Sequence, residues 1–231
     1  MYIQITTRCQ MTCAHCCYNC TKDGEDMSLA TFKAILQDCI DHGDIPFLGG
    51  GEPTLHPRFE EFLMLAIIAV AEIGDGPVGI ITNGGVTKRA LYLANLAKAE
   101  IISAQLSRDI YHDEIDPKVV DAFASIPNGI RDTTKGGVRE PLPQGRALEI
   151  LGLDPIEDAE DINMIKDGSN CVCGDSVCTP NGVIRQCGCE DAPVIGEAES
   201  GYNSPMPGEC CNSSYFIDEC VKNEEYAHLL G

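Results

Sequence analysis

Hydrophobic and polar positions along residues 1 to about 165 alternate between two periods, which predicts alternating strands and helices. Apolar and polar residues take turns from Tyr2 to Thr6, a pattern typical of a strand. Apolar residues then recur on one helical face between Leu29 and Ile40, and Ser28 precedes them as a candidate N-cap. A second apolar run over 45–48 predicts the next strand.

The same alternation continues further along the chain. We predict a helix starting near residue 57, a strand over 78–82, a helix over 87–99, a strand over 101–106, and a helix opened by Asp116 and Pro117. Repeated units of this kind predict an α/β fold with a parallel sheet, either open or curled into a barrel. In both architectures the ligand site lies at the carboxyl ends of the strands.

Three unusual loops fall at these predicted strand ends. The first, called here the cysteine loop, is RCQMTCAHCCYNC at residues 8–20. The second is the glycine run at 49–51 with Glu52, and the third is Thr82-Asn83-Gly84. Because the carboxyl ends of parallel strands share one edge, we expect the three loops to meet there.

The chain changes character after about residue 168. Eight cysteines lie between Cys171 and Cys220, separated by Gly, Pro, Asn and Ser. The acidic stretch DPIEDAED at 154–161 can begin a last helix before them. Because this tail has little apolar periodicity, we expect bound metal to organise it in place of a core.

The cysteine content points to metal binding rather than to disulfides. The chain has 14 cysteines in 231 residues and is 44% hydrophobic, so it is long enough to bury a core without cross-links. The start of the chain lacks a basic and apolar leader, which predicts a reducing, cytoplasmic setting. Cys39 is the exception, because it falls on the apolar stripe of a helix and is expected to be buried.

Charge and hydropathy exclude two classes of partner. The formal net charge of -20, with only 16 Lys and Arg, disfavours nucleic acids and anionic membranes. The longest apolar run, over 62–71, is shorter than the about 20 residues that a membrane-spanning helix needs. We therefore expect neither a nucleic acid nor a membrane as a partner.

Three cysteines of the cysteine loop have a spacing that suits one inorganic centre. Cys9, Cys13 and Cys16 are spaced C-x3-C-x2-C, which lets consecutive thiolates converge on a single site. Structural zinc usually takes four closed ligands, often from two separated C-x2-C pairs. Three thiolates fit better with a [4Fe-4S] cluster that keeps one iron open. Cys17 and Cys20 stay unassigned.

These cysteines, followed by Gly50-Gly51-Glu52 after the second strand, resemble the motifs of the radical SAM superfamily. The resemblance implies a partial (β/α)6 TIM-like barrel over residues 1–165. It also implies S-adenosylmethionine (SAM) bound to the open iron through its amino and carboxylate groups. Reductive cleavage of SAM would yield a 5′-deoxyadenosyl radical that abstracts hydrogen from a substrate. A small electron donor, similar to flavodoxin or ferredoxin, is the implied partner.

The resemblance also implies a set of SAM-binding residues. His15 takes the place of the aromatic residue beside the adenine, although a role as metal ligand is the competing interpretation. Arg146, in a stretch resembling P-x-GRA, is expected to pair with the SAM carboxylate or to brace the sheet by an ion pair. The other candidates are Gly50, Gly51 and Glu52 around the SAM ammonium, and Asn83 and Ser107 near its ribose and methionyl part.

The tail resembles the first half of the SPASM and Twitch auxiliary-cluster signature, with Cys171, Gly182 and Cys187 at matching spacings. The second half is absent, which favours a shorter Twitch-like module over 166–231 with a second, auxiliary [4Fe-4S] cluster. Thr179-Pro-Asn-Gly-Val183 is a good hairpin turn. A zinc ribbon is the alternative. The implied ligands are Cys171, Cys187, Cys189 and Cys210, with Cys173, Cys178 and Cys211 competing.

The substrate is less defined than the chemistry. We expect a peptide or protein side chain as substrate, as in peptide maturation, recognised at the barrel mouth and the tail because the chain begins at its first strand. Oxidation of a small molecule such as a sugar or nucleotide is the first alternative. A non-catalytic zinc-binding interaction protein is the second. Tyr111, His112 and Asp113 lie beyond the fourth strand and are candidates to face substrate.

Overall fold

One sheet forms the middle of the molecule in the computed structural model, which describes residues 1–132, 145–147, 176–188, 192 and 194–202. Its strand order is β5-β4-β3-β2-β1-β6-β7-β8-β9. Neighbours from β5 through to β6 pair in parallel, and β6 to β9 pair antiparallel. The strands are β1 (Tyr2–Thr6), β2 (Phe47–Gly50), β3 (Gly79–Thr82), β4 (Ser103–Arg108), β5 (Ile130–Asp132), β6 (Val177–Cys178), β7 (Val183–Arg185), β8 (Val194–Glu197) and β9 (Gly201–Tyr202).

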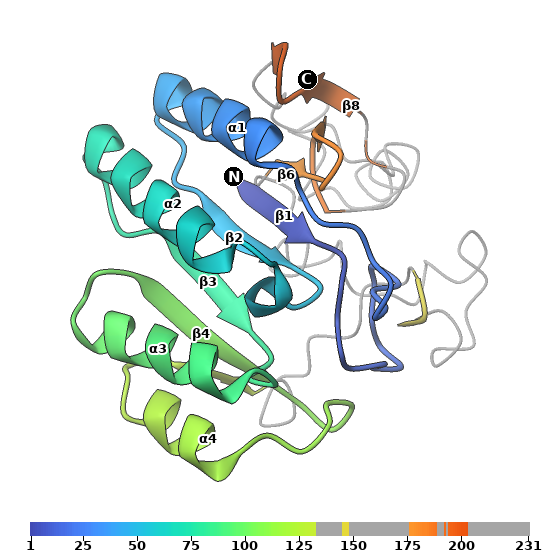
Figure 1. Ribbon diagram of the computed structural model, residues 1–231, viewed down its shortest axis with the longest axis vertical. Coiled ribbons are helices and arrows are strands. Elements are labelled where there is room, and N and C mark those ends of the chain that lie inside the picture. Colours follow the sequence, from blue (N-terminus) through green and yellow to red (C-terminus); the bar gives the residue numbers. More distant parts are fainter. Residues whose placement is uncertain (133–144, 148–175, 189–191, 193, 203–231) are drawn as a thin grey trace, which may run out of the picture.

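Four helices cover one face of the parallel part of this sheet (Figure 1). Each follows a strand, so the predicted βα repeat and the partial TIM-like core are confirmed. None of the described helices has the length and the apolar composition needed to cross a membrane. The helices are α1 (Leu29–His42), α2 (Phe59–Ile73), α3 (Thr87–Lys98) and α4 (Pro117–Ala124), and a short 3-10 helix, η1 (Pro53–Leu55), precedes α2.

Local capping signals set several helix starts as the sequence predicts. The Ser28 hydroxyl accepts a hydrogen bond from the Thr31 backbone N–H at 3.0 Å, at the start of α1. Asp116 caps α4 in the same way. Strand β4 begins two residues later than predicted, because the Ile101 N–H still bonds to the Leu96 carbonyl at the end of α3.

The core lies between the sheet and the helices and reaches both faces of the central strand. Ile3 and Ile5 of β1 are fully buried, and so are their neighbours on the opposite face, Gln4 and Thr6. Burial on both faces is typical of a parallel sheet. Cys39 on α1 is also fully buried, which confirms its predicted role as a small core residue.

The described part of the tail extends the core sheet. Strands β6 and β7 form the predicted hairpin, in which the Thr179 N–H donates to the Val183 carbonyl at 2.9 Å. Strand β6 pairs with β1 and places Cys178 opposite Ile3, where its thiol is fully buried. The helix predicted near 154–161 and the candidate ligands Cys171, Cys189 and Cys210 lie outside the described residues. A domain boundary near residue 165 stays a prediction.

A buried carboxylate joins the carboxyl ends of β2 and β3. Glu52 has no exposed surface and accepts four hydrogen bonds, two of them from Thr54. The Thr82 hydroxyl donates at 2.7 Å and the Asn83 backbone N–H at 2.6 Å. Burial raises the pKa of Glu52, and the four hydrogen bonds oppose that rise. The carboxylate fixes the backbone that leads into Asn83.

Two glycines let the ends of β1 and β2 come into contact. The Gly51 N–H donates to the Thr6 carbonyl and the Glu52 N–H to the Arg8 carbonyl, each at 2.8 Å. A Cβ atom on Gly51 would lie 2.3 Å from the Arg8 carbonyl oxygen. Gly50 has a φ of 124° and would place a Cβ 2.1 Å from the Thr6 carbonyl oxygen. Side chains are therefore excluded at both positions.

We expect Gly51→Ala to destabilise the fold by about 3 kcal/mol, because its methyl group would overlap backbone that has no space to move. Gly43→Ala is the control: Gly43 has a φ of 72° with nothing within 4 Å of an added Cβ. Its cost should be only the strain of the left-handed conformation, about 1 kcal/mol. Urea unfolding of the reduced protein measures both, and equal costs would contradict the close approach.

We expect Glu52→Gln to destabilise the fold by about 2 kcal/mol, because its amide nitrogen would face a buried donor. The raised pKa of Glu52 contributes stability below the unfolded-state pKa that is lost as pH rises through the folded-state value. The stability gap between wild type and variant should therefore shrink as pH rises above the unfolded-state pKa of about 4.3. Glu60→Gln, at an exposed ion pair with Arg89, should cost under about 1 kcal/mol. An equally small loss of stability in Glu52→Gln would contradict the role of Glu52 in joining the ends of β2 and β3.

Candidate active site

The cysteine loop leaves the carboxyl end of β1 and is closed at its base by backbone contacts. The Cys9 N–H donates to the Thr21 carbonyl at 2.7 Å, and the Cys16 N–H donates to the Cys13 carbonyl at 3.2 Å. The second hydrogen bond closes a tight turn that brings Cys13 and Cys16, the last two predicted ligands, together. Cys9 is buried, Cys13 and Cys16 are half-buried, and all three are free thiols.

The electrostatics of the three thiols favour a bound cation. Burial, together with smaller contributions from the nearby Cys9, Asp109 and Cys16, raises the pKa of the Cys13 thiol to about 11. Burial likewise raises the pKa of Cys9, with Cys16 among the contributing neighbours. Three thiolates in so small and half-buried a volume repel one another unless a metal supplies positive charge. This donor set fits the iron-sulfur cluster that its spacing predicts.

Cys20, unassigned from the sequence, contacts one of the predicted ligands. Its thiol is buried and hydrogen-bonds to Cys16. The bond from Cys20 lowers the pKa of Cys16 to about 5, against the effect of burial. The pKa of Cys20 is raised by the same bond and by its burial. Cys20 therefore favours the thiolate form of Cys16.

Arg146 fastens the cysteine loop from far along the chain. Its Nε donates to the Cys13 carbonyl and its Nη1 to the Cys20 carbonyl, both at 3.1 Å. Its backbone N–H donates to the Cys16 carbonyl at 3.0 Å. A Cβ atom on Gly145 would lie 2.6 Å from the Cys17 carbonyl oxygen. Arg146 thus braces the loop, and its predicted bond to the SAM carboxylate stays a prediction.

Asn83 connects the end of β3 to the cysteine loop. Its Nδ2 donates to the Cys9 Sγ at 3.5 Å, and its Oδ1 accepts from the Gln10 side chain at 2.8 Å. The Gly85 backbone N–H donates to the same oxygen at 2.9 Å. A donor aimed at a ligand sulfur stabilises the thiolate. Asn83 therefore meets the loop as predicted, through Cys9 itself.

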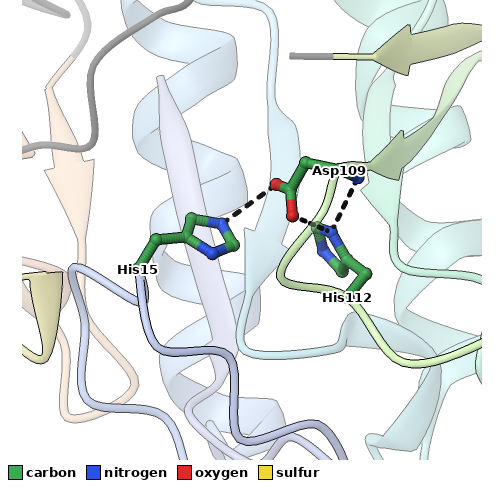
Figure 2. A group of neighbouring side chains, drawn as sticks. All are labelled: His15, Asp109 and His112. Atoms are coloured by element: carbon green, nitrogen blue, oxygen red, sulfur yellow. Dashed lines mark hydrogen bonds and ion pairs between the residues drawn. The ribbon is translucent and has the colours of Figure 1, made fainter. Parts of the chain in front are cut away.

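His15 is paired with the end of β4, a contact that the sequence did not reveal. Figure 2 shows Asp109 between two histidine rings: its Oδ2 lies 3.2 Å from the His15 Nε2, and its Oδ1 lies 2.8 Å from the His112 Nδ1. The His15 ring also lies against Tyr111, with ring centroids 4.9 Å apart. Ser107 is half-buried on β4, two residues before Asp109.

The Asp109 carboxylate is held in its ionised form. Burial opposes its ionisation, but hydrogen bonds from His112 and His15 outweigh that effect and lower the pKa of Asp109 far below its usual range. The Tyr111 N–H also donates to it, at 2.9 Å. His112, a candidate to face substrate, instead turns toward Asp109. The position of Asp109 beside Ser107 at a strand end was the only signal in the sequence.

One known protein is similar in sequence to part of this chain. A protein of Pyrococcus furiosus, named "Tungsten-containing aldehyde ferredoxin oxidoreductase cofactor-modifying protein", is 32% identical over 114 residues. The match covers 48% of this chain and 30% of that protein, so the chain spans about a third of the relative's length.

Solved structures share the fold over nearly the whole chain. BtrN in complex with AdoMet and 2-DOIA superposes with a TM-score of 0.55 at 15% identity, covering 98% of this chain and 83% of its own. The anSMEcpe structure with bound AdoMet and the Cp18Cys peptide gives a TM-score of 0.51 at 15% identity, covering 96% and 86%.

The family comparison covers the site just described. The model of the radical SAM superfamily matches residues 3–152, which include the cysteine loop, the glycine run, Asn83, Asp109 and Arg146. A [4Fe-4S] cluster and SAM are the cofactors that this family implies. The chain therefore belongs to the radical SAM superfamily.

Proposed function

We propose that this enzyme abstracts hydrogen from a peptide or protein side chain. The observation that carries the proposal is the cluster of three free thiols at the carboxyl edge of β1, opposite Asn83. When bound, the cluster and SAM supply the 5′-deoxyadenosyl radical that this family uses for hydrogen abstraction. The fold shared with anSMEcpe, solved with a peptide, supports the substrate class.

The protein holds the cluster side of this site through several groups. Cys9, Cys13 and Cys16 are the proposed iron ligands. Asn83 donates to the Cys9 sulfur, and Arg146 binds the carbonyls of the loop. These contacts fix the loop before any cofactor arrives, so little conformational entropy is lost on binding.

The SAM side of the site is proposed at the joint between β1 and β2. We assign the SAM ammonium to the backbone around Gly50 and Gly51, where the lack of side chains permits close approach. Glu52 supports that backbone, because its carboxylate already accepts four hydrogen bonds. Asn83 and Ser107 are proposed near the ribose and methionyl part.

A small-molecule substrate is the second candidate. The observation that favours it is the fold shared with BtrN, solved with AdoMet and 2-DOIA. Both candidates use the same radical chemistry, so they differ only in the substrate that the active site accepts. Incubation of the enzyme with SAM and deuterated candidate substrates separates them. Deuterium moves into 5′-deoxyadenosine only from the true substrate.

An auxiliary cluster in the tail is part of the proposal. Cys187 supports it, because its thiol is buried at 1% exposure just after β7. Its proposed partners Cys171, Cys189 and Cys210 lie outside the described residues. Such a cluster would sit beside β1, since β6 and β7 extend the sheet on that side.

We expect Cys13→Ala to remove the SAM-cleaving cluster. Anaerobically reconstituted wild type should hold about eight irons, and the variant about four fewer. With dithionite and SAM, wild type should release 5′-deoxyadenosine and the variant at least a hundredfold less. Cys39→Ala, which changes a buried core thiol, should retain iron and activity. Fully reconstituted wild type that cleaves no SAM would disprove the enzymatic proposal.

We expect Cys187→Ala to lose about four irons while 5′-deoxyadenosine release continues, because the auxiliary cluster is separate from the SAM site. Cys39→Ala is again the control, since Cys39 is buried in the core on α1 and is not a candidate ligand. Iron and acid-labile sulfide assays measure both. Unchanged iron in Cys187→Ala would argue against Cys187 as a cluster ligand.

A further inference from the structure

A buried hydrogen bond joins the end of β3 to a sulfur of the cysteine loop. The Asn83 Nδ2 donates to the Cys9 Sγ, with 3.5 Å between the two atoms. Asn83 is 7% exposed and Cys9 is 8% exposed, so water hardly competes for this bond. A hydrogen bond in such surroundings is electrostatically stronger than one in water. Cys9 is a proposed iron ligand, so the amide would reach the cluster through a ligand atom.

Two donors fix the orientation of the Asn83 amide. A backbone N–H can only donate, and the Gly85 N–H lies 2.9 Å from the Asn83 Oδ1. The atom that faces Gly85 must therefore be the oxygen, and the Gln10 Nε2 donates to the same oxygen at 2.8 Å. The nitrogen of the amide is then turned toward Cys9. Rotating the amide by half a turn would bring donor against donor at Gly85 and Gln10, and would leave the sulfur facing an oxygen.

The backbone around Asn83 is held as firmly as its side chain. The Asn83 N–H donates to the Glu52 carboxylate at 2.6 Å, and Glu52 has no exposed surface. The next residue is held too, because the Gly84 N–H donates to the Thr82 hydroxyl at 3.1 Å. The donor to Cys9 is thus in place before any cofactor binds, and it need not move when the charge on the sulfur changes.

A fixed donor at a ligand sulfur affects how readily an iron-sulfur cluster is reduced, and this step rests on the proposed function. Reduction adds one electron from an external reductant, and no bond to Cys9 forms or breaks. The added negative charge is shared between the iron atoms and their sulfur ligands. An N–H donor therefore stabilises the reduced cluster more than the oxidised cluster. Hydrogen bonds to the sulfurs are among the factors that set the reduction potential of such clusters.

We propose that the hydrogen bond from Asn83 to Cys9 raises the reduction potential of the SAM-cleaving cluster. Asn83 acts through the ligand sulfur and is a positioning residue, and Gln10 helps to keep its amide turned toward that sulfur. The Met11 backbone N–H also bonds to the Cys9 sulfur, but a side-chain substitution does not remove it. Asn83 is therefore the donor whose effect can be measured. With this bond in place, a weaker reductant suffices to reduce the cluster.

The test is a redox titration of the anaerobically reconstituted protein with titanium(III) citrate, followed by the EPR signal of the reduced cluster. The SAM-cleaving cluster is identified as the one whose signal changes when SAM is added. Asn83→Leu removes the donor and keeps a side chain of similar size. The equilibrium constant for reduction should fall about tenfold, the worth of one buried hydrogen bond. For a one-electron couple, this lowers the midpoint potential by about 59 mV.

Asn83→Asp keeps the shape of the side chain and changes its charge. Its carboxylate can still accept from Gly85 and Gln10, while its second oxygen would place a negative charge against the Cys9 sulfur. The cluster should be at least as hard to reduce as in Asn83→Leu. Asn95→Asp is the matched control, because it makes the same change on the exposed surface of α3, where solvent screens the charge. Its equilibrium constant for reduction should stay within about twofold of wild type. Iron content is measured for every variant.

The outcomes separate this inference from the function on which it rests. Full iron and an unchanged or raised midpoint potential in either Asn83 variant would overturn the inference and leave the proposed function intact. Loss of the cluster from both Asn83 variants, but not from Asn95→Asp, would also overturn it, because the role of Asn83 would then be purely structural. Wild type with full iron and no signal that responds to SAM would overturn the proposed function itself.

Discussion

A carboxylate with no access to water lies where β2 and β3 end, and it is stable there because every neighbouring group donates to it. Glu52 accepts from the backbone and hydroxyl of Thr54, from the Thr82 hydroxyl and from the Asn83 backbone. These bonds position Asn83, whose side chain then reaches the Cys9 sulfur. The placement of the first proposed iron ligand therefore depends on a residue that contacts neither iron nor solvent. A buried acceptor with all its donors present is rigid, because moving any donor leaves a buried polar atom without a partner.

The cysteine loop is held by segments from four separate parts of the sequence. The joint between β1 and β2 holds its start, Asn83 holds Cys9, and Asp109 holds His15. Arg146 binds the carbonyls of Cys13 and Cys20. The loop has no regular secondary structure of its own, so these contacts supply the order that a helix or strand would otherwise give. Such support is what a site needs when three thiolates must converge on one cluster.

Local signals in the sequence predicted the parts of the fold that depend on neighbours along the chain. Ser28 and Asp116 start their helices, and the spacing of Cys9, Cys13 and Cys16 indicated one shared site. The pairing of His15 with Asp109 was not predictable, because it joins residues more than ninety positions apart through side chains whose types are common at turns. The role of Arg146 was ambiguous for the same reason: an arginine suits a bond to the SAM carboxylate and an ion pair within the protein equally well, and its bonds to the loop carbonyls have no signal in the sequence. The addition of β6 to the edge of β1 has no local signal either, since two residues of strand show no periodicity.

The placement of β6 beside β1 has a consequence for the order in which the protein is assembled. Strand β1 is synthesised before the other strands of this sheet, yet one of its two partners comes from residues 177–178. Arg146 likewise reaches the cysteine loop only after the 126 residues that separate it from Cys20 have been synthesised. A nascent chain thus carries an unpaired strand edge and an unclamped thiol loop for much of its synthesis, a state prone to aggregation and oxidation. Long-range closure of this kind also slows folding. The support for the cysteine loop is therefore completed by segments that are translated long after the cysteines themselves.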